Sequence, residues 1–394
     1  MLRHNFINLI PFLFSKKVFK SPEEKDILIY DAISSDKINI ALRDLESNIF
    51  SSRGEVLNIY ILVRTFIVNS GKVSFFKYLT EYIKITKTKV IISYLGLDKK
   101  LIKLKKYNPN IKIIAIQNGL LTKEELNYYA DNMDAISSLF VFSNDYKNFF
   151  KKKEHTKIFS HGSLINNQYI VKKNANEVLS KKDSNNIYFI SQIREVYLRN
   201  KKNSHFFISK SKIYWKDFYK AEQFFLPFLK KFCDEHNYNL NILGCFENNI
   251  LLEKNYFEEI IGNKIIYHQK DLKSFHYENV LRKDNFVSID SALGYEILSR
   301  KKKICLFPIR GNFINTIERK FGWPNTYSDI DEFWCNILNT KIFSNILENM
   351  MNTDKEVWNN MISKKAENAM SLDLNNEKFY NIVKHHLLNE NNDI

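Results

Sequence analysis

The sequence predicts an α/β fold with two doubly wound, Rossmann-like domains that face a cleft. Short runs rich in β-branched and aromatic residues recur along the chain, and helix-length segments separate them. This alternation is typical of parallel sheets that are covered by helices on both faces. At 394 residues the chain is long enough for two domains. A polar, Lys-rich stretch at 170–185 lacks periodicity, and we place the linker there.

Residues 285–308, NFVSIDSALGYEILSRKKKICLFP, predict a strand, a tight polar turn, a helix and a second strand. Asp290 and Ser291 are helix N-cap residue types, so a helix is expected at 292–302. Backbone N–H groups at a helix start attract anions, and the Ser291 hydroxyl adds a donor. Gly294 would let a bulky group approach the first turn, and Glu296 could accept from a sugar hydroxyl. The alternative is an ordinary capped helix.

In the first half, residues 1–175, strands and helices alternate. Strands are expected at 26–31, 47–51, 89–94, 111–116, 139–143 and 158–159. Helices are expected at 35–45, 73–86, 99–106, 122–131 and 145–152. Residues 55–68 are apolar nearly all round, which predicts a buried helix that starts after the Arg53-Gly54 turn, or a strand.

The second half, residues 186–350, repeats this plan. It predicts strands at 186–190, 240–243 and 264–267, a long amphipathic helix at 215–236 and a helix at 251–260. The tail, residues 351–394, is expected to be helical over 354–388 and to brace the first domain.

The net charge and the cysteines indicate which kinds of binding partner and which compartment suit this chain. The net charge of +15, from 59 basic and 44 acidic residues, suits an anionic partner. No nucleic-acid-binding motif accompanies it, so nucleic acid ranks below phosphate and membrane. Four cysteines without metal-type spacing favour a reduced, cytoplasmic protein. The apolar segment 6–14 is too short to cross a bilayer. We expect it either to form a helix before the first strand or to contact the surface of the inner membrane.

Three turns after strands in the first half carry candidate chemistry. In Ser51-Ser52-Arg53-Gly54-Glu55, an ionised Glu55 at a helix start could deprotonate an acceptor hydroxyl; alternatively it caps the helix and pairs with Arg53. The turn Gln117-Asn118-Gly119 could line a polar cleft, or be a plain turn. The turn His161-Gly162-Ser163 would face the interdomain gap, where the His could donate to a phosphate, or be a satisfied turn residue.

In the second half, Ser191, Gln192 and Arg194 follow the first strand and carry phosphate-compatible groups. Arg194 as a plain surface charge is the alternative. The only Asp-x-Asp spacing, Asp329 and Asp331, falls in an expected loop, so we expect no metal and no cofactor.

Several blocks of the chain resemble a group of bacterial surface carbohydrate biosynthesis proteins: RGEVLNIYILV at 53–63, IQNGL at 116–120, HGSLINN at 161–167, IDSALGYE at 289–296, and FGWP with EFW at 321–334. Those proteins are similar to two-domain GT-B glycosyltransferases. SSRGEVLNIYIL is also similar to the Ser-x-Gly-Glu helix start of Kdo transferases, although Arg53 departs from that pattern.

The resemblance implies a metal-independent, inverting glycosyltransferase of surface polysaccharide or lipopolysaccharide synthesis, at the cytoplasmic face of the membrane. It implies Glu55 as the base, a CMP-linked ulosonic acid as a possible donor, and a glycan or lipid-linked acceptor. A nucleotide-sugar epimerase on the same fold, or a non-catalytic membrane-associated assembly protein, remain the alternatives.

Overall fold

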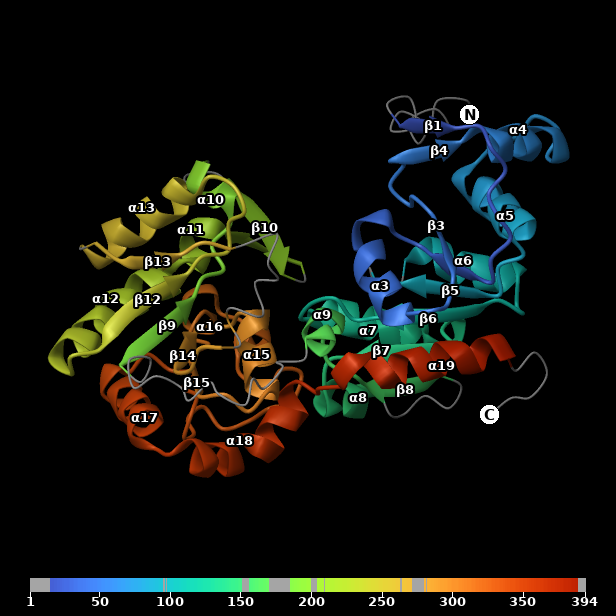
Figure 1. The fold of residues 1–394 in the computed structure, drawn as a ribbon. Helices are drawn as coiled ribbons and strands as arrows, with labels where there is room; N and C mark the ends of the chain where they lie inside the picture. Colours follow the sequence, from blue (N-terminus) through green and yellow to red (C-terminus); the bar gives the residue numbers. More distant parts are fainter. Residues whose placement is uncertain are drawn as a thin grey trace.

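The computed structural model describes residues 15–94, 96, 98–150, 156–169, 185–199, 204–208, 210–262, 264–270, 280 and 282–388. The apolar segment 6–14 and nearly all of the expected linker therefore lie outside the described residues. Figure 1 shows two lobes, each built around its own sheet. This arrangement confirms the prediction of two doubly wound α/β domains.

The first lobe contains a six-stranded parallel sheet in the order β3-β2-β5-β6-β7-β8. Its strands are β2 (Ile27–Ile29), β3 (Ser47–Ile49), β5 (Val90–Ser93), β6 (Lys112–Ile116), β7 (Ser138–Val141) and β8 (Lys157–Ser160). Its helices are α3 (Ser35–Leu42), α4 (Ile59–Val68), α5 (Phe75–Thr86), α6 (Lys99–Tyr107), α7 (Lys123–Asp131), α8 (Asn144–Phe150) and α9 (Leu164–Gln168). The strand order reverses between β2 and β5, which is the switch point of this sheet.

The second lobe contains a five-stranded parallel sheet in the order β13-β12-β9-β14-β15. Its strands are β9 (Asn186–Ile190), β12 (Asn239–Leu243), β13 (Ile266–His268), β14 (Phe286–Ser288) and β15 (Ile304–Leu306). Its helices are α10 (Glu195–Arg199), α11 (Trp215–Phe218), α12 (Lys220–Glu235), α13 (Ile250–Ile261), α15 (Ala292–Ser299), α16 (Gly311–Ile314), α17 (Thr340–Asn352) and α18 (Lys355–Ala369). The switch point lies between β9 and β14.

The last helix, α19 (Glu377–Leu388), returns to the first lobe (Figure 1). Alternate residues of a strand point to opposite faces of a sheet. Accordingly Ile27 and Ile29 pack on one face together with Phe379 and Val383 of α19, whereas Leu28 packs on the other face with α4, α5 and α6. The tail therefore supplies part of one hydrophobic core of the first lobe.

Some local predictions were wrong. Residues 56–58 form strand β4 (Val56–Asn58), which pairs with β1 (Lys16–Val18), and α4 begins only at Ile59. The expected helix 215–236 is broken into α11 and α12, and a β-hairpin of β10 (His205–Ile208) and β11 (Ser211–Tyr214) precedes it. Three-residue strands and tight hairpins leave too few residues for a period to be recognised.

Candidate functional site

The loops after β9 and β14 meet at the switch point of the second sheet. In open α/β sheets, ligands bind in the crevice outside the carboxyl ends of the strands at this point. The Gln192 side-chain amide donates a hydrogen bond to Asp290 Oδ1, so it joins the two loops. The structure thus brings together two of the segments that the sequence suggested for an anionic ligand.

Asp290 lies in a buried ion network that the sequence did not reveal. Arg310, which is fully buried, places its Nε 2.7 Å from Asp290 Oδ1 and pairs with the Glu222 carboxylate. Its Nη1 donates to the Phe218 carbonyl at 2.6 Å. Burial alone would raise the pKa of Asp290, but the charges of Arg310 and Arg319 outweigh it and lower the pKa. Asp290 is therefore an ionised anchor for the loop after β14.

Arg319 is the cation of this network that reaches solvent. Its Nη1 lies 3.5 Å from Asp290 Oδ2, and its side chain is 25% exposed. Asp290 Oδ2 accepts no hydrogen bond within the described part of the chain. Arg319 ends a short 3-10 turn, Ile317–Arg319, and no motif in the sequence marks it as a site residue.

The Ser191 hydroxyl is directed into the protein. It donates to Glu253 Oε1 at 2.5 Å, and the buried Glu253 carboxylate also accepts from the Phe246 backbone N–H and the Tyr267 hydroxyl. The interpretation of this hydroxyl as a ligand for the donor was therefore wrong, because Glu253 already binds it. Arg194, by contrast, is exposed at the start of α10.

The start of α15 retains the features of an anion site. Ser291 is the N-cap residue, and its side chain makes no capping bond. Its backbone N–H donates to the Ser288 hydroxyl at 3.1 Å. The Gly294 N–H donates to the Ser291 carbonyl at 2.9 Å. The N–H groups of Ala292 and Leu293 hold the first two helical positions, where a helix supplies no partner of its own and an anion can bind.

Gly294 has a different role from the one expected. A Cβ atom at Gly294 would lie 3.0 Å from the Ser288 side chain and 3.1 Å from Leu306. The glycine therefore allows α15 to pack closely on β14 and β15, and it does not open the first turn to a ligand.

Glu296 lies on the part of α15 next to the first domain, where the Ser299 hydroxyl accepts from Asn166 Nδ2 at 3.0 Å. Glu296 is buried. Burial raises the pKa of Tyr94 to about 12, and the charge of Glu296 adds to that shift. Tyr94 follows β5 at the switch point of the first sheet. Glu296 thus lies where the two domains meet.

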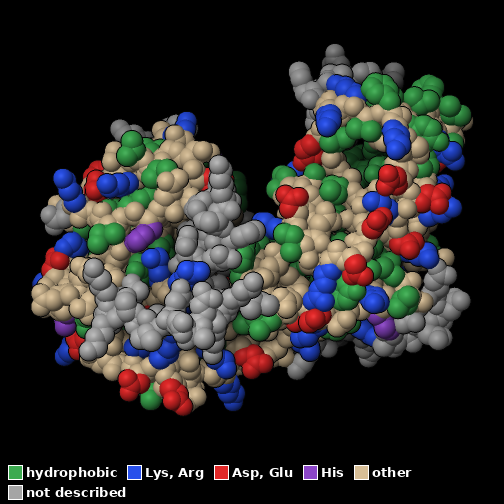
Figure 2. All heavy atoms as spheres, in the orientation of Figure 1, with side chains coloured by type: hydrophobic (Ala, Val, Ile, Leu, Met, Phe, Trp, Pro, Cys, Tyr) green, Lys and Arg blue, Asp and Glu red, His purple; other side chains and the backbone are tan. Residues whose placement is uncertain are grey.

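Loops at the carboxyl edges of both sheets form the domain junction. Trp323 Nε1 donates to the Leu121 carbonyl at 2.8 Å, and the Tyr327 hydroxyl donates to Asp145 at 2.8 Å. Leu121 and Asp145 follow β6 and β7, whereas Trp323 and Tyr327 follow β15. The two carboxyl edges therefore face each other, and Figure 2 shows a deep notch between the lobes beside this junction.

Glu55 does not begin a helix, which corrects the prediction. Asn58 caps α4 by accepting from the Ile61 N–H at 3.1 Å, since a short amide side chain is a strong N-cap and Val56-Leu57 is taken up by the pairing with β1. Glu55 precedes β4, its side chain is exposed, and its carbonyl accepts from the Lys16 N–H at 3.0 Å. It still lies in the loop that follows β3 at the carboxyl edge of the first sheet.

The same loop contacts a buried carboxylate, Asp31, that no motif in the sequence marked as a site residue. Arg53 Nε lies 3.2 Å from Asp31 Oδ2, and Asp31 is buried at the end of β2, beside the switch point. Gly54 has a φ of +86°, which a glycine adopts without strain. The sequence could have indicated Asp31 as a candidate, because this residue ends the strand-like run DILIYD and so lies at the carboxyl end of a predicted strand.

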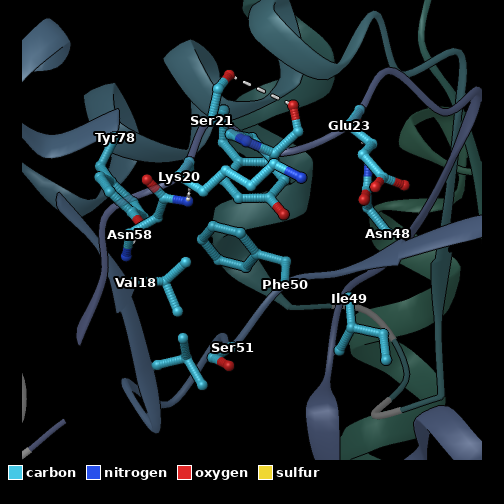
Figure 3. Close-up of a pocket in the computed structure, with 13 residues that line it drawn as sticks. Val18, Lys20, Ser21, Glu23, Asn48, Ile49, Phe50, Ser51, Asn58 and Tyr78 are labelled. Atoms are coloured by element: carbon cyan, nitrogen blue, oxygen red, sulfur yellow. Dashed lines mark hydrogen bonds between the residues drawn. The ribbon is translucent and has the colours of Figure 1, made fainter. Parts of the chain in front are cut away.

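A pocket of about 310 Å³ lies next to this loop (Figure 3). Phe50 forms its floor with Val18 and Ile49, and its rim is polar: Lys20, Ser21, Glu23, Asn48, Ser51 and Asn58. An apolar floor with a few polar groups around it is a common design for small-ligand sites.

The turn Gln117-Asn118-Gly119 is mainly structural. Gln117 is buried, its Oε1 accepts from the Phe142 N–H at 2.8 Å, and its Nε2 donates to the Gly119 carbonyl at 2.8 Å. The expectation that Gln117 lines the cleft was wrong, because its side chain is buried: Oε1 ties the end of β6 to the end of β7, and Nε2 closes the turn itself. Asn118 is exposed.

The turn His161-Gly162-Ser163 receives the returning tail and does not face the gap. His161 is fully buried, with Nε2 3.3 Å from Asp373 Oδ2, and burial lowers its pKa to about 3. A Cβ at Gly162, whose φ is +82°, would lie 2.0 Å from the Ser371 carbonyl. Ser163 caps α9. The predicted contact of His161 with a ligand was wrong, because the tail covers this turn.

Within the described ranges, no group of three or more His, Cys, Asp and Glu residues is placed to hold a metal ion. Over those same residues, none of the helices has the length and hydropathy needed to span a membrane.

Solved structures that share this fold include the following three. One is a putative UDP-N-acetylglucosamine 2-epimerase from Listeria monocytogenes, 12% identical, with a TM-score of 0.56 over 95% of this chain and 100% of that chain. Another is the wall teichoic acid polymerase TagF, 10% identical, with a TM-score of 0.51 over 98% and 93% of the two chains. A glycosyltransferase from Rickettsia africae ESF-5 is 14% identical, with a TM-score of 0.50 over 93% and 100%.

At such identities these likenesses show the fold alone, and a search of curated proteins found no match. A family model described as "putative O-antigen biosynthesis protein" matches residues 114–387, which is more than half of the chain. The resemblance to surface carbohydrate biosynthesis proteins with a GT-B-like fold is thereby confirmed. The chain belongs to the family of putative O-antigen biosynthesis proteins.

Proposed function

We propose that the chain is a glycosyltransferase that transfers a sugar from a nucleotide donor to a glycan or lipid-linked acceptor in surface polysaccharide assembly. The observation that supports this most is the meeting of the loops after β9 and β14 at the switch point of the second sheet. There the ion network fixes the loop after β14, Gln192 joins it to the loop after β9, and α15 begins directly after Asp290 and Ser291.

The donor's phosphate would occupy this crevice. Arg319 is partly exposed and Arg194 is exposed, so both side chains are available to bind phosphate oxygens. The helix dipole of α15 and these guanidinium groups would stabilise the charge on the departing phosphate. Because these groups supply positive charge themselves, this part of the reaction needs no divalent metal.

The acceptor would bind on the first domain, in the pocket floored by Phe50. Glu55, in the adjacent loop, would take the proton of the acceptor hydroxyl while that oxygen bonds to the anomeric carbon. The bond from this carbon to the phosphate oxygen breaks as the new bond forms, and the nucleotide leaves with the electron pair. Attack from the face opposite the leaving group inverts the configuration of that carbon.

A calorimetric titration with CMP, UDP and GDP tests the donor half of the proposal. One of these nucleotides should bind, with CMP the first candidate because of the Kdo transferase similarity. Arg319→Gln should weaken it roughly ten-fold or more, since a charge-assisted hydrogen bond contributes about 1.5–3 kcal/mol. Arg282→Gln is the matched control, because Arg282 precedes β14 and therefore lies at the amino edge of the same sheet, opposite the proposed site. No binding of any nucleotide would favour the non-catalytic assembly protein.

The structural similarity to the putative epimerase from Listeria monocytogenes makes a nucleotide-sugar epimerase the alternative to be tested. An epimerase would act on the free nucleotide sugar without an acceptor, and it would exchange a carbon-bound hydrogen of the sugar with D2O. A glycosyltransferase would show no such exchange and would release nucleotide only when acceptor is present.

A further inference from the structure

Helix α4 has an unusual composition for its position. Its sequence, IYILVRTFIV, has only Arg64 and Thr65 as polar residues, a pattern expected of a buried helix. In the structure only Ile61 and Thr65 are buried. The outer side exposes five large apolar side chains, between 40% and 71% of each: Tyr60, Val63, Phe66, Ile67 and Val68.

A sixth side chain extends this apolar face. Phe19, 72% exposed, directly follows β1, whose Val18 is paired with Asn58 at the start of α4. We name α4 together with Phe19 the α4 face. Figure 2 shows hydrophobic side chains gathered over α4, with basic side chains beside them. Contiguous exposed apolar surface of this kind marks an interaction site.

The surroundings of the α4 face are basic. A groove of about 520 Å³ begins at Val68 and is lined by three lysines, Lys77, Lys84 and Lys103. The acidic residue in its lining, Glu81, is already neutralised by Arg64, whose Nε lies 2.7 Å from Glu81 Oε1. Lys16, Lys20 and Lys72 are exposed on the segments next to the face. The groove thus offers an anion a site with a net positive charge.

We propose that the α4 face docks on the surface of an anionic phospholipid bilayer. The apolar side chains would enter the boundary between headgroups and acyl chains, and the lysines of the groove would bind lipid phosphates. A ten-residue helix is about 15 Å long, so it lies on the bilayer and does not span it. A second copy of the chain is a poorer partner, because two copies each carrying +15 would bring basic surfaces together. This docking does not depend on the proposed enzymatic activity.

Vesicle flotation of the full chain tests the proposal. The wild type should bind phosphatidylcholine vesicles that contain phosphatidylglycerol, bind pure phosphatidylcholine much more weakly, and lose binding as salt rises. Val63→Ser with Ile67→Ser should weaken binding roughly ten-fold or more, since two buried aliphatic side chains are lost. Lys84→Gln with Lys103→Gln should also weaken it, and only for the anionic vesicles.

Leu251→Ser is the matched control, because Leu251 is 72% exposed on α13 of the second domain and Ile67 is 71% exposed. It should bind vesicles like the wild type. All these variants keep the apolar segment 6–14, so a difference between them reports on the α4 face. Thermal unfolding should be unchanged in each. Phe66→Ser serves in place of the double variant if that protein is unstable.

Three outcomes would overturn the proposal. One is that the wild type binds no anionic vesicles. Another is that the α4 variants and Leu251→Ser bind equally well. The third is that light scattering finds a wild-type dimer that the α4 variants convert to a monomer, which would make the face a contact between copies.

Discussion

Replacing Arg310 by Met removes the buried cation while keeping an unbranched side chain of similar length. Arg310 pairs with Glu222 and Asp290, and all three residues are buried. The variant therefore leaves Glu222 buried without its cation, and leaves Asp290 with the Gln192 amide and the more distant charge of Arg319. Loss of one partner from a buried ion pair costs about 3–5 kcal/mol, because the remaining charge is uncompensated.

The cost should depend on pH. Burial already raises the pKa of Glu222 against the opposing charge of Arg310, so without Arg310 the pKa rises further. A carboxyl group with a raised pKa in the folded protein stabilises it below the pKa of the unfolded chain, and that stability is lost as pH rises. The variant should therefore be less destabilised near about pH 5 than near about pH 8.

Urea unfolding followed by circular dichroism at both pH values measures this. The double variant Arg310→Met with Glu222→Met should recover much of the lost stability, because an apolar pair can replace a buried ion pair at little cost. Arg282→Gln, an exposed Arg, should unfold like the wild type. An unchanged unfolding midpoint for Arg310→Met would refute the network.

Three further predictions follow from the same structure. His161 has its pKa lowered to about 3, so wild-type stability should fall as pH drops below the unfolded value of about 6.5, and His161→Gln should flatten this dependence in thermal unfolding. Gly162→Ala should lower the melting temperature, because its Cβ would clash with the Ser371 carbonyl at a positive φ; an unchanged temperature would contradict the tail crossing. Glu55→Gln should abolish sugar transfer and leave calorimetric nucleotide binding intact, whereas retained turnover would reject Glu55 as the base.

The sequence predicted the sheets well, because their central strands are buried on both faces and are continuous apolar runs. Strands β9 and β14 with their following turns were found for this reason. The region around Glu55 was misread, because β4 has only three residues and its partner β1 lies 40 positions earlier, so no local pattern marks the pairing.

The candidate site was predicted only in part, for a related reason. Residues with local signals, such as Ser291 at a helix start, fall near the crevice. Arg310 is 88 positions from Glu222 and 20 from Asp290, so the network exists only in the fold. His161 and Gln117 end strands as expected, but the tail and the neighbouring strand occupy their side chains.

The proposed function depends most on nucleotide binding at the switch point of the second sheet. Hydrogen exchange with and without the nucleotide that binds most tightly tests it directly. We expect slower exchange in residues 191–198 and 290–296 when nucleotide is present, because the ligand would bind the amides of these segments. Protection confined to the first domain, or no change in either segment at a saturating concentration, would contradict the account.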